Sequence, residues 1–383
     1  MGKDSLKFLR WLDQHSAIIF ISGVAASVIV NAIAFERDKK AAKRLRDTYA
    51  RPDLPDNPPV VSFLVPAWNE AHNVDACIRS ILSLRYPNKE LILCAGGGDG
   101  TLALCQQYVG DGVIVLEQSP GEGKQGALRR CFAHSSGEIL FQTDADCILD
   151  DACVEATLAP LLFENEDAVT GFWQPFEFYI RRPFIEFQWA NHLRYQAEKP
   201  DYAETLDGRN SAIRRDALIR AGAFQNDAVI GTDYVLSQRL KAAGYCIHSV
   251  TASRVQTEYP VEFPDYLKQG SRWYRNRLLQ GLKFRQWQDV FTSLWGAGAS
   301  LFIFAGWLAL LLRWRAVGAA WMAGLVHLTF GQARLVAFFK LSAFGQGAFL
   351  SDLPRFTVFT MLSNLAMVKG LLDCFNFEKQ KKW

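Results

Sequence analysis

Two aspartates one residue apart, Asp144 and Asp146, are the residues of this chain best suited to chemistry. They stand at the exit of an apolar stretch, and together they can hold one hard divalent cation. Mg²⁺ takes oxygen ligands and typically keeps one or two protein carboxylates beside substrate phosphates. The pair therefore suits a site that grips a diphosphate. The alternative for Asp146 is a loop residue that caps the helix expected to begin near Asp150.

Short apolar runs place these aspartates in an α/β domain. Residues 60–65 and 90–94 suit buried parallel strands, and residues 73–84 between them have the apolar spacing of a helix. Gly96-Gly-Gly98 then breaks the chain where a ligand loop at the carboxyl edge of a sheet is expected. Further motifs stand along the same region: Pro66-Ala-Trp-Asn-Glu70, Cys94-Ala-Gly-Gly-Gly-Asp-Gly-Thr101, Gly123-Lys-Gln-Gly-Ala-Leu128, Gly208-Arg-Asn-Ser-Ala-Ile-Arg-Arg215, Gly231-Thr-Asp233 and Gln269-Gly-Ser-Arg-Trp273.

The composition of the 383 residues favours a domain with apolar appendages. Half of the chain is hydrophobic, with 27 Phe and 11 Trp, which is rich for a soluble protein. A net charge of +3 gives no argument for a nucleic-acid partner. The 8 Cys lack the spacing of zinc ligands, and we interpret them as buried free thiols in a reducing compartment.

The N-terminal region predicts a membrane span. Residues 16–35 carry no charge over about twenty positions, the length needed to cross a bilayer core. A cleaved signal peptide is the rival, but no small-residue cleavage site is evident. The basic run from Arg37 to Arg51 is cytoplasmic by the positive-inside rule, which puts the N-terminus outside. A solvated helix face is the alternative for that run.

Three C-terminal segments, 290–312, 316–333 and 356–372, are further candidates, the last weakened by Lys369. Three spans there put the basic tail outside, whereas two spans and an interfacial segment keep it inside, and the sequence leaves both open. The predicted organisation is an extracytoplasmic N-terminus 1–15, a transmembrane helix 16–35, a basic cytoplasmic linker 36–57, an α/β domain 58–260, amphipathic interface helices 261–289, two or three transmembrane helices 290–375 and a basic tail 376–383.

In their order and spacing, these motifs resemble those of the family 2 glycosyltransferases, over about residues 58 to 280. These are inverting enzymes with a GT-A nucleotide-sugar fold. The resemblance is to the membrane-bound branch that includes cellulose, chitin and hyaluronan synthases and ceramide glucosyltransferase. It implies a mixed, mainly parallel sheet with helices on both faces, flanked by transmembrane helices, and a hexosyltransferase activity.

The resemblance also implies catalytic roles. Asp144 and Asp146, the latter more directly, supply the site for Mg²⁺ or Mn²⁺, which neutralises the departing diphosphate. Asp233 takes the place of the base that removes the proton of the acceptor hydroxyl. The family's motif there is like Thr-Glu-Asp, and the middle carboxylate is missing. The alternative for Asp233 is the N-cap of a helix expected at residues 234–243.

Donor and acceptor residues are implied in the same way. Trp68 stacks on the base, Glu70 bonds to the base or ribose, and Lys124 approaches the phosphates, unless it is a solvated loop lysine. Gln269, Arg272 and Trp273 share one helical face at i, i+3 and i+4. Arg272 pairs with the diphosphate and Trp273 holds an acceptor sugar, on a helix that we also expect at the membrane surface. The remaining predicted contacts are Pro66, Ala67, Asp99 and Asp144 for the donor and Asn210 for the acceptor region.

One departure from the family bears on the donor. Most members end the second strand with an acidic pair that reads the uracil N–H, and this chain has Cys94 and Ala95 there. A buried N–H left without an acceptor costs about 1–3 kcal/mol. Either Asp99 or a backbone carbonyl replaces the acid, or the donor is not a uridine nucleotide. We keep a UDP-sugar as the favoured donor.

The number of predicted spans favours a lipid acceptor. A polymer must cross the membrane through protein-lined helices, and few are predicted here. We therefore expect an integral protein of the cell inner membrane, with a cytoplasmic catalytic domain that transfers a sugar to a lipid acceptor. The alternatives are an oligosaccharide or polysaccharide synthase with a glycan acceptor, a non-catalytic nucleotide-sugar-binding protein and, less favoured, a nucleotidyltransferase.

Overall fold

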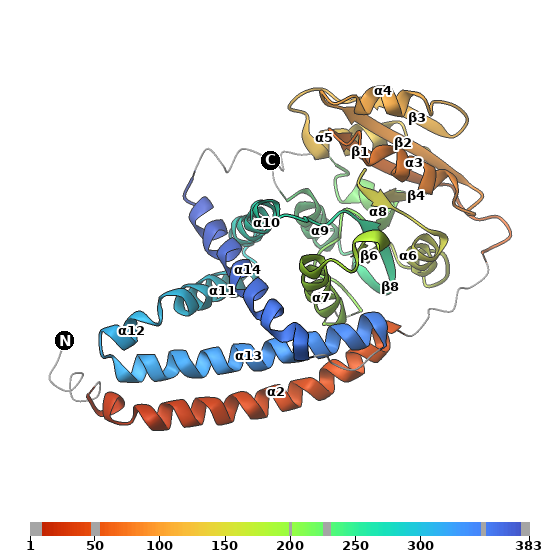
Figure 1. Cartoon of the computed structure of the whole chain (residues 1–383). Helices are drawn as coiled ribbons and strands as arrows, with labels where there is room; N and C mark the ends of the chain where they lie inside the picture. The colour runs from red at the N-terminus through yellow and green to blue at the C-terminus, as the bar shows by residue number, and fades with distance from the viewer. Residues whose placement is uncertain (1–9, 47–53, 199–200, 225–230, 346–349, 377–383) are drawn as a thin grey trace. The chain divides into compact units, whose positions relative to one another are not determined.

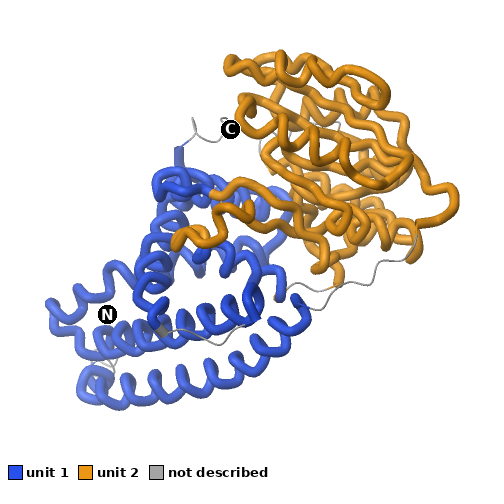
Figure 2. The backbone as a smooth tube through the Cα atoms, turned by 45° about the vertical axis from the view of Figure 1, so that its right-hand side comes forward, with its two compact units in different colours: residues 1–46, 186–197, 260–377 blue, residues 47–185, 198–259, 378–383 orange. Residues whose placement is uncertain are grey.

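The computed structural model describes residues 10–46, 54–198, 201–224, 231–345 and 350–376. The chain divides into two compact units, which Figure 2 colours separately. Unit 1 comprises residues 1–46, 186–197 and 260–377, and unit 2 comprises residues 47–185, 198–259 and 378–383. The predicted domain 58–260 extends one residue beyond the segment of unit 2 that ends at residue 259. Residues 186–197, which lie within the predicted domain, belong to unit 1.

Unit 2 is built on one eight-stranded sheet in the order β3-β2-β1-β4-β7-β6-β8-β5. The pairs β3–β2, β2–β1, β1–β4 and β6–β8 are parallel, while β7 is antiparallel to both of its neighbours and β5 is antiparallel to β8. This mixed sheet agrees with the predicted fold class (Figure 1). The strands are β1 Val61–Trp68, β2 Lys89–Gly96, β3 Val113–Glu117, β4 Ile139–Gln142, β5 Cys147–Ile148, β6 Ala168–Pro175, β7 Ser211–Arg214 and β8 His248–Thr257.

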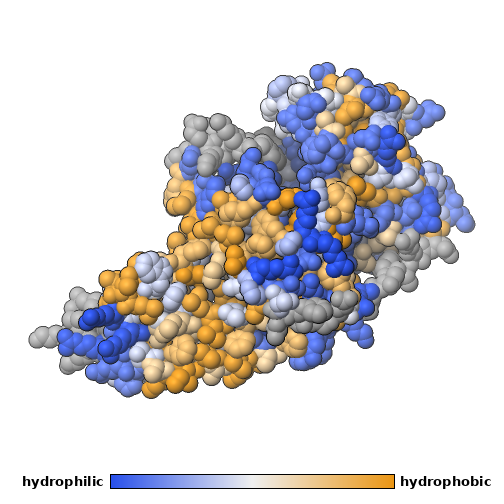
Figure 3. All heavy atoms as spheres, in the orientation of Figure 1, coloured by the Kyte–Doolittle hydropathy of each residue, from blue (hydrophilic) through white to orange (hydrophobic). Residues whose placement is uncertain are grey.

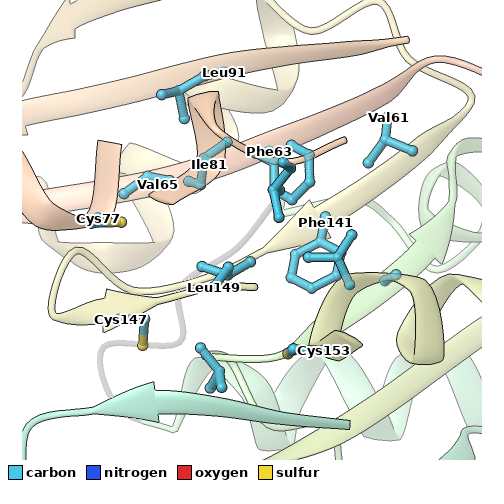
Figure 4. Close-up of a cluster of buried hydrophobic side chains, with 14 of the residues drawn as sticks. Val61, Phe63, Val65, Cys77, Ile81, Leu91, Phe141, Cys147, Leu149 and Cys153 are labelled. Carbon is cyan, nitrogen blue, oxygen red and sulfur yellow. The ribbon is translucent and has the colours of Figure 1, made fainter. Parts of the chain in front are cut away.

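Strand β1 is apolar on both faces apart from the buried Ser62, and both faces are covered. Phe63 belongs to a core cluster on one face of the sheet, where its ring centroid lies 5.0 Å from that of Phe141 (Figure 4). Leu64 belongs to a second cluster on the other face. A strand covered on both faces loses the alternation of a half-exposed one. The helices of unit 2 are α3 Val74–Leu82, α4 Thr101–Gln106, α5 Gly123–Ala133, α6 Asp151–Phe163, η1 Glu177–Tyr179, α8 Arg215–Arg220 and α9 Thr232–Ala242. Helix α7 Pro183–Ala197 begins in unit 2, and its residues 186–197 belong to unit 1.

Several local predictions need correction. Pro66, Ala67 and Trp68 form the end of β1 rather than a loop that follows it, and the Ala67 side chain is fully buried. Helix α6 is capped by Asp150, whose carboxylate accepts a hydrogen bond from the Cys153 N–H at 2.7 Å. The alternative role of Asp146 as that cap is therefore wrong.

The cysteines agree with the interpretation as free thiols. All eight are free in the described residues, and six of them are buried in unit 2. Cys246 is the exception in unit 2, because its side chain is exposed.

Unit 1 contains two long helices, α2 Ser16–Arg46 and α13 Arg315–Phe344, which lie side by side (Figure 1). The Ala316 N–H donates to Asp13 at 2.9 Å, and further along both helices Arg334 bonds Asn31 at 3.1 Å and Asp38 at 2.9 Å. The contacts advance together along both chains, so the two helices run in the same direction.

These two helices are the ones, among the described residues, that are long and apolar enough to cross a membrane, by length and composition only. Apolar side chains gather over them in Figure 3. The predicted linker 36–57 differs from the structure over residues 36–46, because α2 continues through them to Arg46. The predicted segment 316–333 lies inside α13, which runs on past it.

The other candidate spans are shorter helices. Segment 290–312 is divided between α11 Trp287–Ala305 and α12 Leu308–Leu311, and Arg313, with a φ of 58°, turns the chain into α13. Segment 356–372 lies in α14 Leu353–Asp373, which follows the short helix η2 Leu350–Asp352.

Helix α10 Phe263–Lys283 is a single amphipathic helix at the position of the predicted interface segment. It forms an antiparallel pair with α11, where Arg277 bonds Asp289 at 2.8 Å and Tyr274 donates to the Ser293 carbonyl. Helix α14 packs along it, with Lys369 donating to Ser271 at 3.2 Å.

Candidate active site

Asp144 and Asp146 lie in the segment that follows β4, and both side chains are partly exposed. Their neighbours Thr143, Ala145 and Cys147 are buried. Residues 144–147 form a turn, which is closed by the Cys147 N–H donating to the Asp144 carbonyl at 3.1 Å. Besides burial, the Asp146 charge raises the pKa of Asp144, so the two carboxylates lie near each other.

Lys124 holds the first of these carboxylates. It is the second residue of helix α5 rather than part of a loop, and its Nζ lies 2.6 Å from Asp144 Oδ1. Burial opposes the ammonium charge, but Asp144 and Asp233 outweigh it, so the pKa of Lys124 is raised. Burial also raises the pKa of Asp144, against the opposing effect of the Lys124 ammonium. The alternative of a solvated loop lysine is wrong, because this side chain is 19% exposed and ion-paired.

Asp233 lies in the first turn of α9, whose N-cap is Gly231, so the alternative role as N-cap is also wrong. Gln142, the last residue of β4, donates its Nε2 to Asp233 Oδ1 at 3.1 Å and to the Gly208 carbonyl at 3.3 Å. The carboxylate packs so closely on Gly208 that a Cβ there would lie 2.5 Å from Asp233 Oδ1. Burial raises the pKa of Asp233, the Lys124 ammonium lowers it, and the Asp144 charge raises it again, with a net upward shift.

An ion pair beside Asp233 was missed in the sequence. Arg209 donates from Nε and Nη2 to both oxygens of Asp207, at 2.9 and 2.7 Å, and its guanidinium lies 3.8 Å from the Trp173 ring centroid. Burial works against the Asp207 charge, but Arg209 outweighs it and holds the pKa of that carboxyl below its usual value. The sequence signal that could have predicted this ion pair is the aspartate and the arginine that flank Gly208.

Asn210 has a structural role instead of the predicted contact with the acceptor. Its side chain is fully buried, and its Nδ2 donates to the Phe172 carbonyl at 3.0 Å and to Ser253 Oγ at 2.8 Å. Its Oδ1 accepts from Thr157 Oγ1 at 3.0 Å. Asn210 therefore ties β6, α6 and β8 together behind the Asp207–Arg209 turn.

The predicted donor residues gather at the carboxyl ends of β1 and β2. Asp99 accepts hydrogen bonds from the Ala71 N–H at 2.9 Å and from the Thr101 N–H at 3.0 Å, so it joins the loops that follow these strands. Burial raises the pKa of Glu70 to about 7, and the neighbouring Asp146 and Asp144 charges add to the shift. Trp68 is 38% exposed at the end of β1, and Pro66 is half-buried in the same strand.

The three residues of the last motif belong to unit 1. Gln269, Arg272 and Trp273 lie on α10, as one helix, which the spacing predicts. Trp273 is 39% exposed, and its ring centroid lies 6.4 Å from that of His192 on α7.

The carboxylates of Asp144, Asp146 and Glu70 suit a divalent cation. Among the described residues there is no preformed group of three or more His, Cys, Asp or Glu side chains that could hold a metal. Asp144 and Asp146 nevertheless lie near each other, and Glu70 is close enough to them for its pKa to be raised by their charges. Mg²⁺ needs only one or two such carboxylates when substrate phosphates complete its coordination. These residues therefore fit the predicted Mg²⁺ or Mn²⁺.

The fold and this cluster of carboxylates define a glycosyltransferase of the GT-A type, and comparisons with known proteins agree. The model of glycosyl transferase family 2 matches residues 62–222, and that of glycosyl transferase family group 2 matches residues 144–344, about half of the chain. The chain belongs to glycosyl transferase family group 2.

Three known relatives are between 24% and 27% identical to this chain over the matched residues. The chain is 26% identical to glycosyltransferase AglE of Haloferax volcanii over 49% of its length and 64% of the relative's. It is 27% identical to the probable glycosyltransferase YdaM of Bacillus subtilis over 59% and 57%. It is 24% identical to hyaluronan synthase of Streptococcus pyogenes over 56% of each chain. The chain thus matches between about half and two thirds of these relatives' lengths.

One solved structure shares the fold of nearly the whole chain. It is the mannosyltransferase PcManGT of Pyrobaculum calidifontis, in complex with GDP-Man and Mn²⁺, with a TM-score of 0.54 and 19% identity over 94% of this chain and 99% of that one.

Proposed function

We propose that this protein transfers a sugar, with inversion, from a nucleotide-diphospho-sugar to an acceptor hydroxyl at the cytoplasmic surface of a membrane. The observation that carries the proposal is the arrangement of two carboxylates around one lysine. Lys124 binds Asp144 directly, and the charges of Asp144 and Asp233 both raise its pKa. A candidate base and a candidate metal site therefore lie within electrostatic reach of each other on one unit.

In this proposal Asp233 accepts the proton of the acceptor hydroxyl as its oxygen attacks the anomeric carbon. The hydrogen bond from Gln142 and the close packing on Gly208 fix the direction of the carboxylate. A divalent cation held by Asp144 and Asp146, when bound, neutralises the charge that develops on the leaving diphosphate. The Mn²⁺ in the PcManGT complex supports such a cation. Lys124 is placed to exchange its bond with Asp144 for a phosphate oxygen of the donor.

The parallel pair of α2 and α13 supports a particular membrane topology. If α2 crosses from outside to inside, as the basic residues at its cytoplasmic end indicate, then α13 crosses in the same sense. The α11–α12 segment must then carry the chain from the cytoplasmic side to the outside, with Arg313 near the outer turn. Helix α14 begins again on the cytoplasmic side and lies along the amphipathic α10. This arrangement of two C-terminal crossings and an interfacial helix keeps the basic tail inside.

With so few crossings, we propose a lipid acceptor that receives one or a few sugars. A channel for a long glycan needs more protein-lined helices than one such chain supplies. A glycan synthase is the second candidate, and the specific observation in its favour is the 24% identity to hyaluronan synthase over 56% of the chain.

The test is to incubate detergent-purified protein with Mn²⁺ or Mg²⁺ and a panel of nucleotide-sugars, with and without total lipid extract. Release of nucleoside diphosphate that requires lipid, together with a hexose mass added to one lipid, supports the proposal. A ladder of sugar masses formed without lipid favours the glycan synthase. Asp146→Ala checks the metal site, because the variant is expected to lose metal-dependent donor binding. A wild-type protein that binds a donor and never transfers its sugar favours the non-catalytic alternative.

A further inference from the structure

The carboxyl end of β2, where the donor base is expected, has no acidic side chain. Cys94 and Ala95, which stand where the family has its acidic pair, are both fully buried. Asp99, the first acid after them, is already held by Ala71 and Thr101. Recognition of the base therefore calls for another acceptor at this end of the strand.

Gln118 supplies such an acceptor. It directly follows β3, and its backbone N–H donates to the Ala95 carbonyl at 2.7 Å, which places it beside the end of β2. Its side chain is 5% exposed, and its Nε2 donates to the Gly123 carbonyl at 3.2 Å. In the part of the chain that the structure describes, its buried Oε1 has no hydrogen-bond partner. A buried acceptor left unmet is costly, so a donor supplied by a ligand is a physical reason for it to persist.

The surroundings of Gln118 are those of a base-binding site. A Cβ at Gly96 would lie 2.6 Å from the Gln118 carbonyl oxygen and 2.8 Å from the Trp68 ring, so the ring, the glycine and Gln118 adjoin one another. Trp68 is 38% exposed and offers a face on which a base can stack. The Gly123 carbonyl accepts the hydrogen bond from the Gln118 amide, and Lys124 is the next residue. The lysine that we propose to bind the donor phosphates therefore follows directly on the residue that Gln118 contacts.

We infer that Gln118 reads the donor base in place of the missing acidic pair, and that its Oε1 accepts the ring N–H of uracil or guanine stacked on Trp68. The inference rests on the proposed function and deepens it. Uracil and guanine present a ring N–H next to a carbonyl, whereas the corresponding ring nitrogens of cytosine and adenine are acceptors. The donor therefore carries a base with such a ring N–H, and nucleotides of cytosine and adenine bind poorly.

The test is calorimetric titration of the full-length protein in detergent with UDP, GDP, CDP and ADP, each in the presence of Mn²⁺. We expect UDP or GDP to bind at least about tenfold more tightly than CDP and ADP, the consequence of one hydrogen bond to a buried acceptor. Gln118→Met keeps the length of the side chain without the acceptor and is expected to abolish that preference, with CDP and ADP binding little changed. Gln118→Glu keeps an acceptor oxygen and is expected to retain the preference.

The matched control is Gln107→Met, at an exposed position after α4, which leaves the preference intact. Thermal unfolding of each variant establishes that it is folded. A Gln118→Met protein that is folded and still prefers UDP or GDP overturns this inference and leaves the proposed function standing, as does a wild type that prefers CDP or ADP. Failure of all four diphosphates to bind with Mn²⁺ overturns the proposed function and the inference with it.

Discussion

Gly208→Ala is expected to slow sugar transfer without weakening the donor complex. In the structure a Cβ at Gly208 would lie 2.5 Å from Oδ1, 2.6 Å from Oδ2 and 2.7 Å from Cγ of Asp233. Real contacts of this kind are essentially never below 3.0 Å, so the carboxylate must move by a large part of an ångström. A misplacement of about 1 Å at a catalytic group can cost roughly 10²-fold in rate, which corresponds to about 2.7 kcal/mol in the activation barrier.

The assay for Gly208→Ala is kcat from diphosphate release at saturating donor, together with the Kd of the donor from calorimetry. We expect kcat to fall by roughly 10²-fold and Kd to stay within about threefold, because the methyl group displaces the base and leaves the phosphate contacts in place. Gly110→Ala is the control, since nothing lies within 4 Å of a Cβ there. A folded Gly208→Ala enzyme with kcat within about twofold of wild type would refute the assignment of Asp233 as the base.

Three further predictions concern the charges and the topology. In its proposed role, Asp233 acts as a base only when ionised, so its raised pKa means that activity is lost at a higher pH than for an ordinary carboxylate. Lys124→Met removes a charge that lowers this pKa, so the acid limb of the kcat/KM profile should move to higher pH. Glu70, with a pKa of about 7, should lose its proton when a divalent cation binds, so calorimetry at pH 7 in buffers of different ionisation enthalpy should show proton release that Glu70→Gln removes. A cysteine at Arg313 should react with a membrane-impermeant maleimide only from outside the cell, whereas the native exposed Cys246 should react only from the cytoplasmic side; labelling of both from one side would contradict the topology.

The local parts of the site were predictable because short-range geometry decides them. Asp144 and Asp146 lie near each other since they are two residues apart in one turn, and Gln269, Arg272 and Trp273 lie on one helix since their spacing is helical. The parts that depend on contacts between distant segments were not. Asn210 was assigned to the acceptor region because its motif is near the site, but the position of its side chain is decided by partners on α6 and β8.

The same limit explains what was missed around the base. The Asp207–Arg209 pair gains its place from stacking on Trp173 of β6, which lies more than thirty residues away in the sequence. The direction of α13 relative to α2 follows from polar partners such as Asn31 and Arg334, and hydropathy alone does not choose which helices pair. A count of apolar segments therefore predicted candidate spans and left the location of the tail open.

The pairing of α2 with α13 also has a consequence for biosynthesis. The two helices are separated by about 270 residues, which a ribosome needs on the order of 10 to 60 s to translate. On the proposed topology, the nascent chain is held in the membrane by α2 alone until α11 and α12 are made, and Asp38 and Asn31 lack their contacts with Arg334 until α13 follows. The enzyme must therefore complete most of its catalytic unit at the membrane before its anchor is finished.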